Sequence, residues 1–412
     1  MKVGVFHPGV QHSRQTALAL QDLDKLAFLA TGLFDHPHSP ARRVLSALPA
    51  KLRDRADREL SRFASNRLDP ALVRAFPRYE LPERLASRLG ATALAQSLDA
   101  RLNEAFGRKI AAIAQDEQVA LWGYDGSSWS AFTDARTAQC PKILDRTMAD
   151  CRSWNAQRAR LIEQEPDWFA DGSPAWSAER IAHDDLEYAA ADRIVCGSPF
   201  VAETIAGNSQ VDGLQEKLTV LPYSYAVELF GAHPPADAPG PHDPVRFLFV
   251  GQVAGRKGIR HVLDAFMLTA RSEASLTVVG PVVVDDGLLA PYRDRVTFTG
   301  PVPRAQVPAI MAQHHAFVFP SYNEGSAVVL LEAMASGLAI IQTKAAGLGA
   351  SAQSGVVLDR PDTQAVASAM RALIDDKETL QEMRRAAKTE AARCDFAAYR
   401  ATIEQVLQDM GI

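Results

Sequence analysis

Residues 319–337 have the sequence FPSYNEGSAVVLLEAMASG, and this stretch does most to decide the fold. The apolar run Ala316–Phe319 ends at a proline, a short polar loop with Glu324 follows, and an apolar helix is expected from about Ala327. A buried strand that leads through a short loop into a helix is the repeating unit of a parallel α/β sheet. The stretch therefore predicts a Rossmann-like domain with this loop at the carboxyl end of a strand.

Short apolar runs of the same kind alternate with longer amphipathic stretches along the whole chain. This alternation is typical of α/β proteins, and runs this apolar suit strands that are buried on both faces of a parallel sheet. The predicted strands are Val3–Phe6, Ala27–Ala30, Val119–Trp122, Lys142–Leu144, Ile194–Cys196, Leu218–Leu221, Arg246–Val250, Leu276–Val279, Val296–Phe298, Ala316–Phe319, Ala339–Gln342 and Val356–Leu358.

A proline-rich stretch near the middle divides the chain. The 412 residues are too many for one hydrophobic core, which rarely grows past about 300 residues. Residues 231–244, GAHPPADAPGPHDP, contain five prolines, so neither a helix nor a central strand continues through them. They form either a hinge or a plain surface loop. We predict two Rossmann-like parallel-sheet domains that face a cleft, residues 1–225 and 226–395, and a final helix in 396–412 that packs on the first domain.

Charge is unevenly distributed along the chain. There are 44 Lys and Arg residues against 49 Asp and Glu, and 47% of all residues are hydrophobic, which is ordinary for a globular enzyme. Residues 41–110 hold 15 basic and 8 acidic residues, with leucines and alanines at helical spacing. This region is either a solvated face with internal ion pairs or a basic face that contacts an anionic membrane. The net charge of −5 and the lack of interleaved aromatic residues argue against nucleic acid as a partner.

The cysteines and the apolar segments indicate the compartment. The four cysteines are scattered without CxxC spacing, which favours reduced thiols and no structural metal site. No segment reaches the roughly 18 apolar residues that span a bilayer, and the start, MKVGVFHPGV, is expected to be a strand and not a signal peptide. We therefore expect a cytoplasmic protein, either free or at the inner face of the membrane.

A second stretch carries a glycine-containing turn. Residues 247–258, FLFVGQVAGRKG, run from a buried strand through Gly251 to Arg256 and Lys257, and an amphipathic helix follows. Glycines let a backbone approach a ligand closely, and a helix N-terminus favours anions. Two adjacent cations at this turn would neutralise a diphosphate. Surface cations on an ordinary strand-to-helix turn fit the same pattern.

Glu332 is unusual because it lies inside an otherwise apolar helix, where an unpaired carboxylate is costly. A ribose diol is a suitable partner, since an ionised carboxylate only accepts hydrogen bonds, and an internal salt bridge is the other option. Glu324 lies in the loop before this helix, beside backbone N–H groups at the helix start. The two residues predict a crevice that offers a ligand both carboxylates and hydrogen-bond donors.

These motifs resemble the signature of the retaining glycosyltransferases of family 4, which have the GT-B fold. The resemblance rests on the spacing E-x7-E within P-S-x-x-E-G-S-A-x-x-x-L-E-A-M-A-S-G and on the upstream G-x5-K-G that begins at Gly251. It covers residues 187–412 and is weak over 13–186. The resemblance implies an acceptor-binding first domain and a nucleotide-sugar-binding second domain.

The resemblance also implies roles for individual residues. Arg256 and Lys257 would clamp the donor diphosphate, and Glu332 would accept hydrogen bonds from the ribose. Glu324 would contact the donor sugar and complete the catalytic set with the two cations. The other donor-side positions are Gly9, Gly251, Val302, Gly325, Ser326 and Ala327, and the acceptor-side candidates are His12, Tyr124 and Asp125.

The implied activity is transfer of a sugar, with retention, from a UDP- or GDP-linked donor to a hydroxyl of a saccharide or lipid-linked acceptor. Bacterial enzymes of this kind act in polysaccharide, lipopolysaccharide or glycolipid synthesis. No metal or other cofactor is expected, because no DxD-like pair is placed to bridge the phosphates. A non-catalytic nucleotide-sugar-binding partner subunit and another GT-B enzyme, such as an epimerase or phosphorylase, stay open as alternatives. A dehydrogenase is disfavoured, because GVFHPGVQH lacks G-x-G-x-x-G after the first strand.

Overall fold

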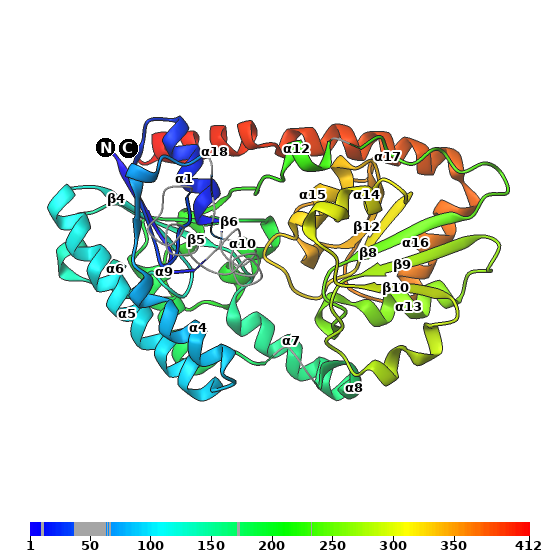
Figure 1. The fold of residues 1–412 in the computed structure, drawn as a ribbon, viewed down its shortest axis with the longest axis horizontal. Coiled ribbons are helices and arrows are strands. Elements are labelled where there is room, and N and C mark those ends of the chain that lie inside the picture. The colour runs from blue at the N-terminus through cyan, green and yellow to red at the C-terminus, as the bar shows by residue number, and fades with distance from the viewer. Residues whose placement is uncertain (10–11, 37–62, 64, 66, 171–173, 232) are drawn as a thin grey trace, which may run out of the picture.

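The computed structural model contains two parallel sheets with helices packed around them (Figure 1). It describes residues 1–9, 12–36, 63, 65, 67–170, 174–231 and 233–412. Within these residues one sheet has seven strands in the order β3-β2-β1-β4-β5-β6-β7, and the other has six in the order β10-β9-β8-β11-β12-β13. The predicted fold class, an α/β protein with two Rossmann-like parallel sheets, is confirmed.

The first sheet reverses its strand order at β1, which lies between β2 and β4. At such a point the loops that follow the two neighbouring strands leave a crevice at the carboxyl edge of the sheet. Strand β3 was not predicted, because its three residues are too short to show a period. The strands of this sheet are β1 Val3–Phe6, β2 Leu26–Thr31, β3 Val73–Ala75, β4 Ala120–Tyr124, β5 Lys142–Arg146, β6 Arg193–Cys196 and β7 Leu218–Val220.

The second sheet reverses in the same way between β8 and β11. The reversal brings the turn after β8 next to the loop after β11, although the two are more than sixty residues apart in the sequence. All twelve predicted strands are present, with ends within two residues of the predicted ones. The strands of this sheet are β8 Val245–Val250, β9 Ala274–Val279, β10 Val296–Gly300, β11 Ala316–Phe319, β12 Ala339–Thr343 and β13 Gly355–Leu358.

Helices connect the strands and cover the sheets (Figure 1). Before the proline-rich stretch they are α1 Ser13–Asp22, α4 Leu81–Arg88, α5 Thr92–Glu117, α6 Trp129–Phe132, α7 Cys151–Gln164, α8 Pro166–Phe169, α9 Ala178–Ala190, α10 Pro199–Asn208 and α11 Leu214–Lys217. Helix α12 Val227–Phe230 ends directly before that stretch, and the helices after it are α13 Ile259–Met267, α14 Val307–Met311, α15 Val328–Ala335, α16 Thr363–Asp375, α17 Lys377–Ala391 and α18 Phe396–Asp409.

Two segments of the chain cross over and pack on the sheet of the other half. Helix α18 lies on α1, where Tyr399 and Ile403 join the core of the first sheet (Figure 1). Helices α7 and α8 precede residue 225, yet Trp154 and Trp168 are buried in the core of the second sheet. The predicted division at residue 225 therefore separates the sheets but not all of the helices around them.

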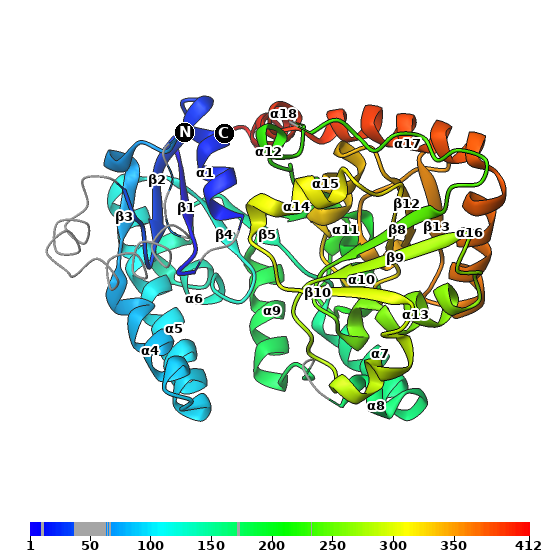
Figure 2. The same ribbon diagram turned by 45° about the vertical axis from the view of Figure 1, so that its right-hand side comes forward.

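The basic region 41–110 is only partly described: residues 41–62, 64 and 66 lie outside the described residues. Its described remainder includes α4 and α5, which pack against each other and project from the first sheet (Figure 2). Within the described ranges, no helix has both the length and the apolar character to cross a bilayer.

Candidate functional site

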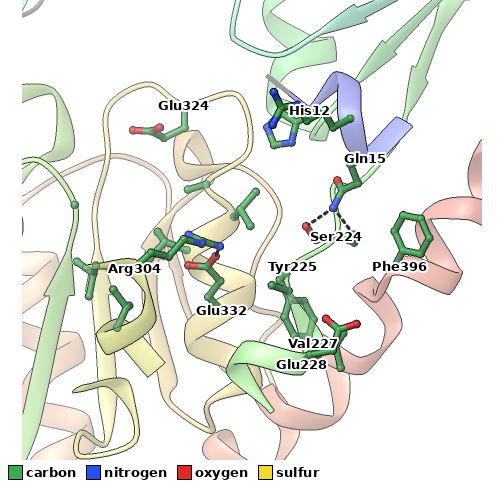
Figure 3. Close-up of a pocket in the computed structure, with 18 of the residues that line it drawn as sticks. His12, Gln15, Ser224, Tyr225, Val227, Glu228, Arg304, Glu324, Glu332 and Phe396 are labelled. Carbon is green, nitrogen blue, oxygen red and sulfur yellow. Dashed lines mark hydrogen bonds and ion pairs between the residues drawn. The ribbon is translucent and has the colours of Figure 1, made fainter. Parts of the chain in front are cut away.

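A cleft of about 830 Å³ lies between the two sheets. Its walls come from the start of α1, the segment that joins the halves, the loops after β8 and β11, and helices α15 and α18. His12 and Gln15 stand on one wall, and Glu324, Glu332 and Arg304 stand on the other (Figure 3). The two motifs predicted to bind a ligand thus open into one cavity.

The carboxylate of Glu324 is held by two cations. Its Oε1 lies 2.6 Å from Nζ of Lys257 and 2.8 Å from Nη1 of Arg256, and it accepts a hydrogen bond from Oγ of Ser321 at 2.8 Å. Burial alone would raise the pKa of Glu324, but the two cations outweigh burial and hold the pKa below its usual value. The carboxylate is therefore ionised at neutral pH.

The two predicted cations have different surroundings. Arg256 lies outside the cleft lining and donates to the carbonyl of Asn323 as well as to Glu324, so it braces the loop after β11. Lys257 lines the cleft, and its Nζ lies 5.1 Å from the centre of the Phe319 ring. Of the pair, Lys257 is thus the cation within reach of a ligand.

Glu332 is buried in α15 and forms an ion pair with the exposed guanidinium of Arg304. Burial raises the pKa of Glu332, and the attraction of Arg304 only partly offsets this effect. The structure thus contains the salt bridge considered from the sequence. Both members of the pair line the cleft, so together they present hydrogen-bond acceptors and donors to a ligand (Figure 3).

The opposite wall is made by the first turn of α1. The ring of His12 stacks on Tyr223, with ring centres 3.7 Å apart and planes 3° from parallel. Burial lowers the pKa of His12 to about 4, so the imidazole is neutral at pH 7. Gln15 donates to the carbonyl and the hydroxyl of Ser224, at 3.1 and 2.6 Å, and its buried Oε1 has no hydrogen-bond partner among the described residues.

Gly325 lies where the loop after β11 meets the first half of the chain. Its carbonyl accepts a hydrogen bond from Oγ of Ser198 at 2.6 Å. A Cβ atom on Gly325 would lie 1.6 Å from the carbonyl oxygen of Thr147, closer than any real contact. Only glycine therefore allows this backbone-to-backbone approach, which fixes one side of the cleft.

We expect Gly325→Ala to push the backbones of residues 325 and 147 apart. This should lower the free energy of unfolding by about 1–3 kcal/mol, the usual cost of overpacking. Denaturant unfolding measures the effect. Gly207→Ala is the control, because a Cβ atom at Gly207 would meet nothing within 4 Å. Equal stability of the two variants would mean that the contact at Gly325 does not hold the halves together.

The remaining predicted residues lie in three places. Gly251 and Ala327 line the cleft with Lys257. Ser326 lies outside the cleft lining, and its buried Oγ has no hydrogen-bond partner among the described residues. Val302 packs against the core of the second sheet.

Two of the three acceptor-side candidates lie outside the main cleft. Tyr124 is fully buried, and its hydroxyl lies 2.6 Å from Oγ1 of Thr16, so it is a core residue and does not line the main cleft. Gly9 and Asp125 line a second cavity of about 260 Å³ at the carboxyl edge of the first sheet, and not the main cleft. His12 alone of the three acceptor-side candidates lines the main cleft.

The sequence interpretation missed Arg304 and Gln15. Each follows the carboxyl end of a strand: Arg304 comes four residues after β10, and Gln15 lies in the first turn of the helix after β1. Side chains at these ends face the crevice of a parallel sheet, and this general rule was the available signal. Within the described residues, no group of three His, Cys, Asp or Glu side chains could hold a metal ion.

Known proteins resemble this chain in the sequence of its second half and in its fold. A family model described as "Glycosyl transferases group 1" matches residues 244–376, which run from β8 through α16. Glycogen synthase of Mycobacterium tuberculosis is 30% identical over 155 residues, which make up 35% of this chain and 37% of the synthase. The match therefore spans little more than a third of that curated relative and lies in one part of this chain.

Solved structures match over the full length. Sucrose-phosphate synthase of Thermosynechococcus elongatus superposes with a TM-score of 0.66 at 17% identity, covering 100% of this chain and 99% of the other. HepE of Anabaena, solved with UDP-glucose, gives a TM-score of 0.60 at 14% identity over 99% of this chain and 100% of the other. The protein thus has the GT-B fold of glycosyltransferases, and its residues 244–376 form a glycosyl transferases group 1 domain.

Proposed function

We propose that the protein transfers a sugar, with retention at the anomeric carbon, from a nucleoside diphosphate sugar to a hydroxyl acceptor. The observation that carries the proposal is the meeting of Lys257, Glu324 and Glu332 in one cleft between the two sheets. A cation suits a diphosphate, and carboxylates suit the hydroxyls of a sugar and a ribose. HepE, which shares the fold, was solved with UDP-glucose, and this supports a nucleoside diphosphate sugar as the donor.

The ion pairs around Glu324 suggest how the donor is received. Lys257 pairs with Glu324 at 2.6 Å, so an entering diphosphate competes for its ammonium group. Arg256 pairs with the same carboxylate at 2.8 Å, so it still balances the negative charge of Glu324 when Lys257 turns to the phosphates. Glu324 is then free to accept hydrogen bonds from the donor sugar without becoming an unpaired buried charge.

The chemical difficulty is the departure of the diphosphate, which gains negative charge as the sugar leaves. Lys257 and Arg304 provide positive charge on the same wall of the cleft, before the reaction starts. Fixed charge of this kind stabilises a transition state without reorganisation of solvent. The proposal therefore includes a metal-independent reaction. From the resemblance to bacterial glycosyltransferases, it also places the product in polysaccharide, lipopolysaccharide or glycolipid synthesis.

A thermal-shift comparison of UDP, GDP and ADP with their sugars tests the donor. A ligand that binds only the folded protein stabilises it by about 2.7 kcal/mol at a hundred times its Kd. We expect one nucleoside diphosphate to raise the melting temperature clearly above the others. With an added hydroxyl acceptor, the protein should then transfer the sugar of the matching sugar nucleotide to the acceptor oxygen and release the nucleoside diphosphate. No shift with any of them would contradict the proposed function.

We also propose a peripheral membrane contact at α4 and the start of α5. Leu81 and Leu85 lie at helical spacing on α4, Leu89 directly follows that helix, and Leu94 lies in the first turn of α5; all four are between 50% and 76% exposed. Such rows are rare on soluble monomers, and leucines insert readily into the interface of a bilayer. The basic residues in 41–110 suit the anionic lipids of the cytoplasmic leaflet.

The double variant Leu85→Glu/Leu89→Glu should lower the affinity for vesicles of phosphatidylcholine and phosphatidylglycerol at least tenfold. The reason is that two exposed leucines, which would insert into the bilayer interface, are replaced by two charges that the lipid repels. Vesicle co-sedimentation measures the affinity. Leu268→Glu is the control, because Leu268 is also 60% exposed but lies after α13 on the other half. Unchanged binding of the double variant would remove the membrane contact.

A further inference from the structure

The first sheet contains a buried carboxyl group that takes no part in the donor site. Asp145 lies near the carboxyl end of β5, is 1% exposed, and forms no salt bridge with any residue that the structure describes. Its Oδ1 accepts a hydrogen bond from the hydroxyl of Tyr223 at 2.8 Å, and its Oδ2 accepts one from the indole N–H of Trp122 at 3.3 Å. Burial raises the pKa of Asp145 to about 7, and these hydrogen bonds only partly offset the effect. A buried carboxyl group without a cation is costly and occurs mostly at functional sites.

Tyr223 connects this carboxyl group to the main cleft. It follows β7, and only 1% of its surface is exposed. Its ring stacks on the ring of His12, with the two centres 3.7 Å apart. The ring also packs against Gly197, where a Cβ atom would lie 2.7 Å from ring carbon Cε2. With its hydroxyl bound to Asp145, the Tyr223 ring therefore has little freedom to move away from His12.

The helix that carries His12 is fixed as well. Thr16, one turn further along α1, is fully buried, and its Oγ1 lies 2.6 Å from the hydroxyl of Tyr124 and 2.8 Å from that of Tyr399. These contacts tie the start of α1 to β4 and α18. From this helix the ring of His12 extends towards the wall of the cleft that carries Glu324 (Figure 3). The backbone and the ring of His12 are thus both held in place before a ligand enters.

We propose that Asp145 and Tyr223 are positioning residues, which hold the ring of His12 in an orientation that lets it exchange a hydrogen bond with a substrate hydroxyl in the main cleft. The inference rests on the proposed function, because that hydroxyl belongs to a substrate of the same reaction. One nitrogen of a neutral imidazole accepts a hydrogen bond and the other donates one. A ring that already points at its partner gives up little conformational freedom when the substrate binds.

An NMR titration of the full chain, with its histidines labelled with carbon-13, tests the inference without turnover. Burial lowers the pKa of His12 to about 4. Tyr223→Phe keeps the ring but removes the hydrogen bond to Asp145, and Asp145→Leu removes the acceptor. We expect both changes to loosen the Tyr223 ring, so that water reaches the imidazole and the pKa of His12 rises to about 5 or higher. Loss of a negative charge alone would not raise the pKa of a histidine. Asp145→Asn keeps an acceptor for Tyr223 and should titrate like the wild type.

Turnover of the preferred donor gives a second readout. Tyr223→Phe should lower kcat at least about fivefold with an unchanged KM for the donor, whereas in a His12→Ala background the same change should alter kcat by less than about twofold. Non-additivity of this kind marks residues that act through one another, and a merely structural role would not produce it. Tyr292→Phe is the control, because its hydroxyl donates to the carboxylate of Asp264 on the second half. It should change neither kcat nor the titration of His12.

The outcomes separate this inference from the proposed function. An unchanged titration of His12 in Tyr223→Phe would overturn the positioning role, and so would an equal loss of kcat with and without His12. Tyr223→Phe carries the test by itself if Asp145→Leu does not fold. If the protein turns over no nucleoside diphosphate sugar, the proposed function fails, while the titration still decides whether Tyr223 and Asp145 hold His12.

Discussion

Replacing Glu324 by alanine should lower the rate of sugar transfer by about 10³-fold, the scale seen when a preorganised electrostatic contact to a reacting centre is removed. Nucleoside diphosphate binding should persist, because Lys257 loses its carboxylate partner and is freed for the phosphates. The turnover number of the preferred donor measures the first effect, and the thermal shift measures the second. A loss of kcat with binding retained marks a contact made to the reacting sugar.

Two further variants distinguish this loss of activity from a folding defect. Glu324→Gln keeps the size and the hydrogen bond from Ser321 but removes the charge, so it should fold like the wild type and remain inactive. Glu404→Ala removes an exposed carboxylate on α18 and should leave turnover unchanged. Wild-type turnover in either Glu324 variant would end the role proposed for this residue.

Lys257→Ala should weaken nucleoside diphosphate binding by about 10²–10³-fold, which corresponds to the loss of about 2.7–4 kcal/mol for one preorganised donor. The thermal shift produced by the preferred nucleotide should then disappear. The fold should survive, since Arg256 still pairs with Glu324 at 2.8 Å.

The matched control for this variant is Lys344→Ala, which removes an exposed lysine paired with Asp359 at the surface. It should keep the full shift. A full shift in Lys257→Ala as well would take Lys257 out of the donor site and leave Arg304 as the cation to examine.

Local pattern explains which parts of the fold and site could be predicted from the sequence. Strands such as β11 are short, apolar and bounded by loop residues, so their type and ends can be recognised without knowledge of their neighbours. The position of Glu324 and Lys257 in one cleft also follows from the sequence, because both lie where a strand ends in a parallel sheet.

Contacts between distant segments explain what was missed. The partner of Glu332 is Arg304, 28 residues away, and no local spacing identifies this pair. Tyr124 ends its strand like a site residue, but α1 covers it and Thr16 binds its hydroxyl. Helix α7 has apolar and polar residues like any surface helix and α8 is only one turn long, so the sequence does not say on which sheet Trp154 and Trp168 pack.

The most direct measurement of the central claim is a crystal structure of the protein with UDP or GDP, whichever gives the larger thermal shift. We predict a diphosphate within hydrogen-bond distance of Nζ of Lys257, with the ribose hydroxyls on the carboxylate of Glu332 in the cleft between the sheets. A nucleotide bound elsewhere, or one in the cleft that touches neither side chain, would contradict the donor site.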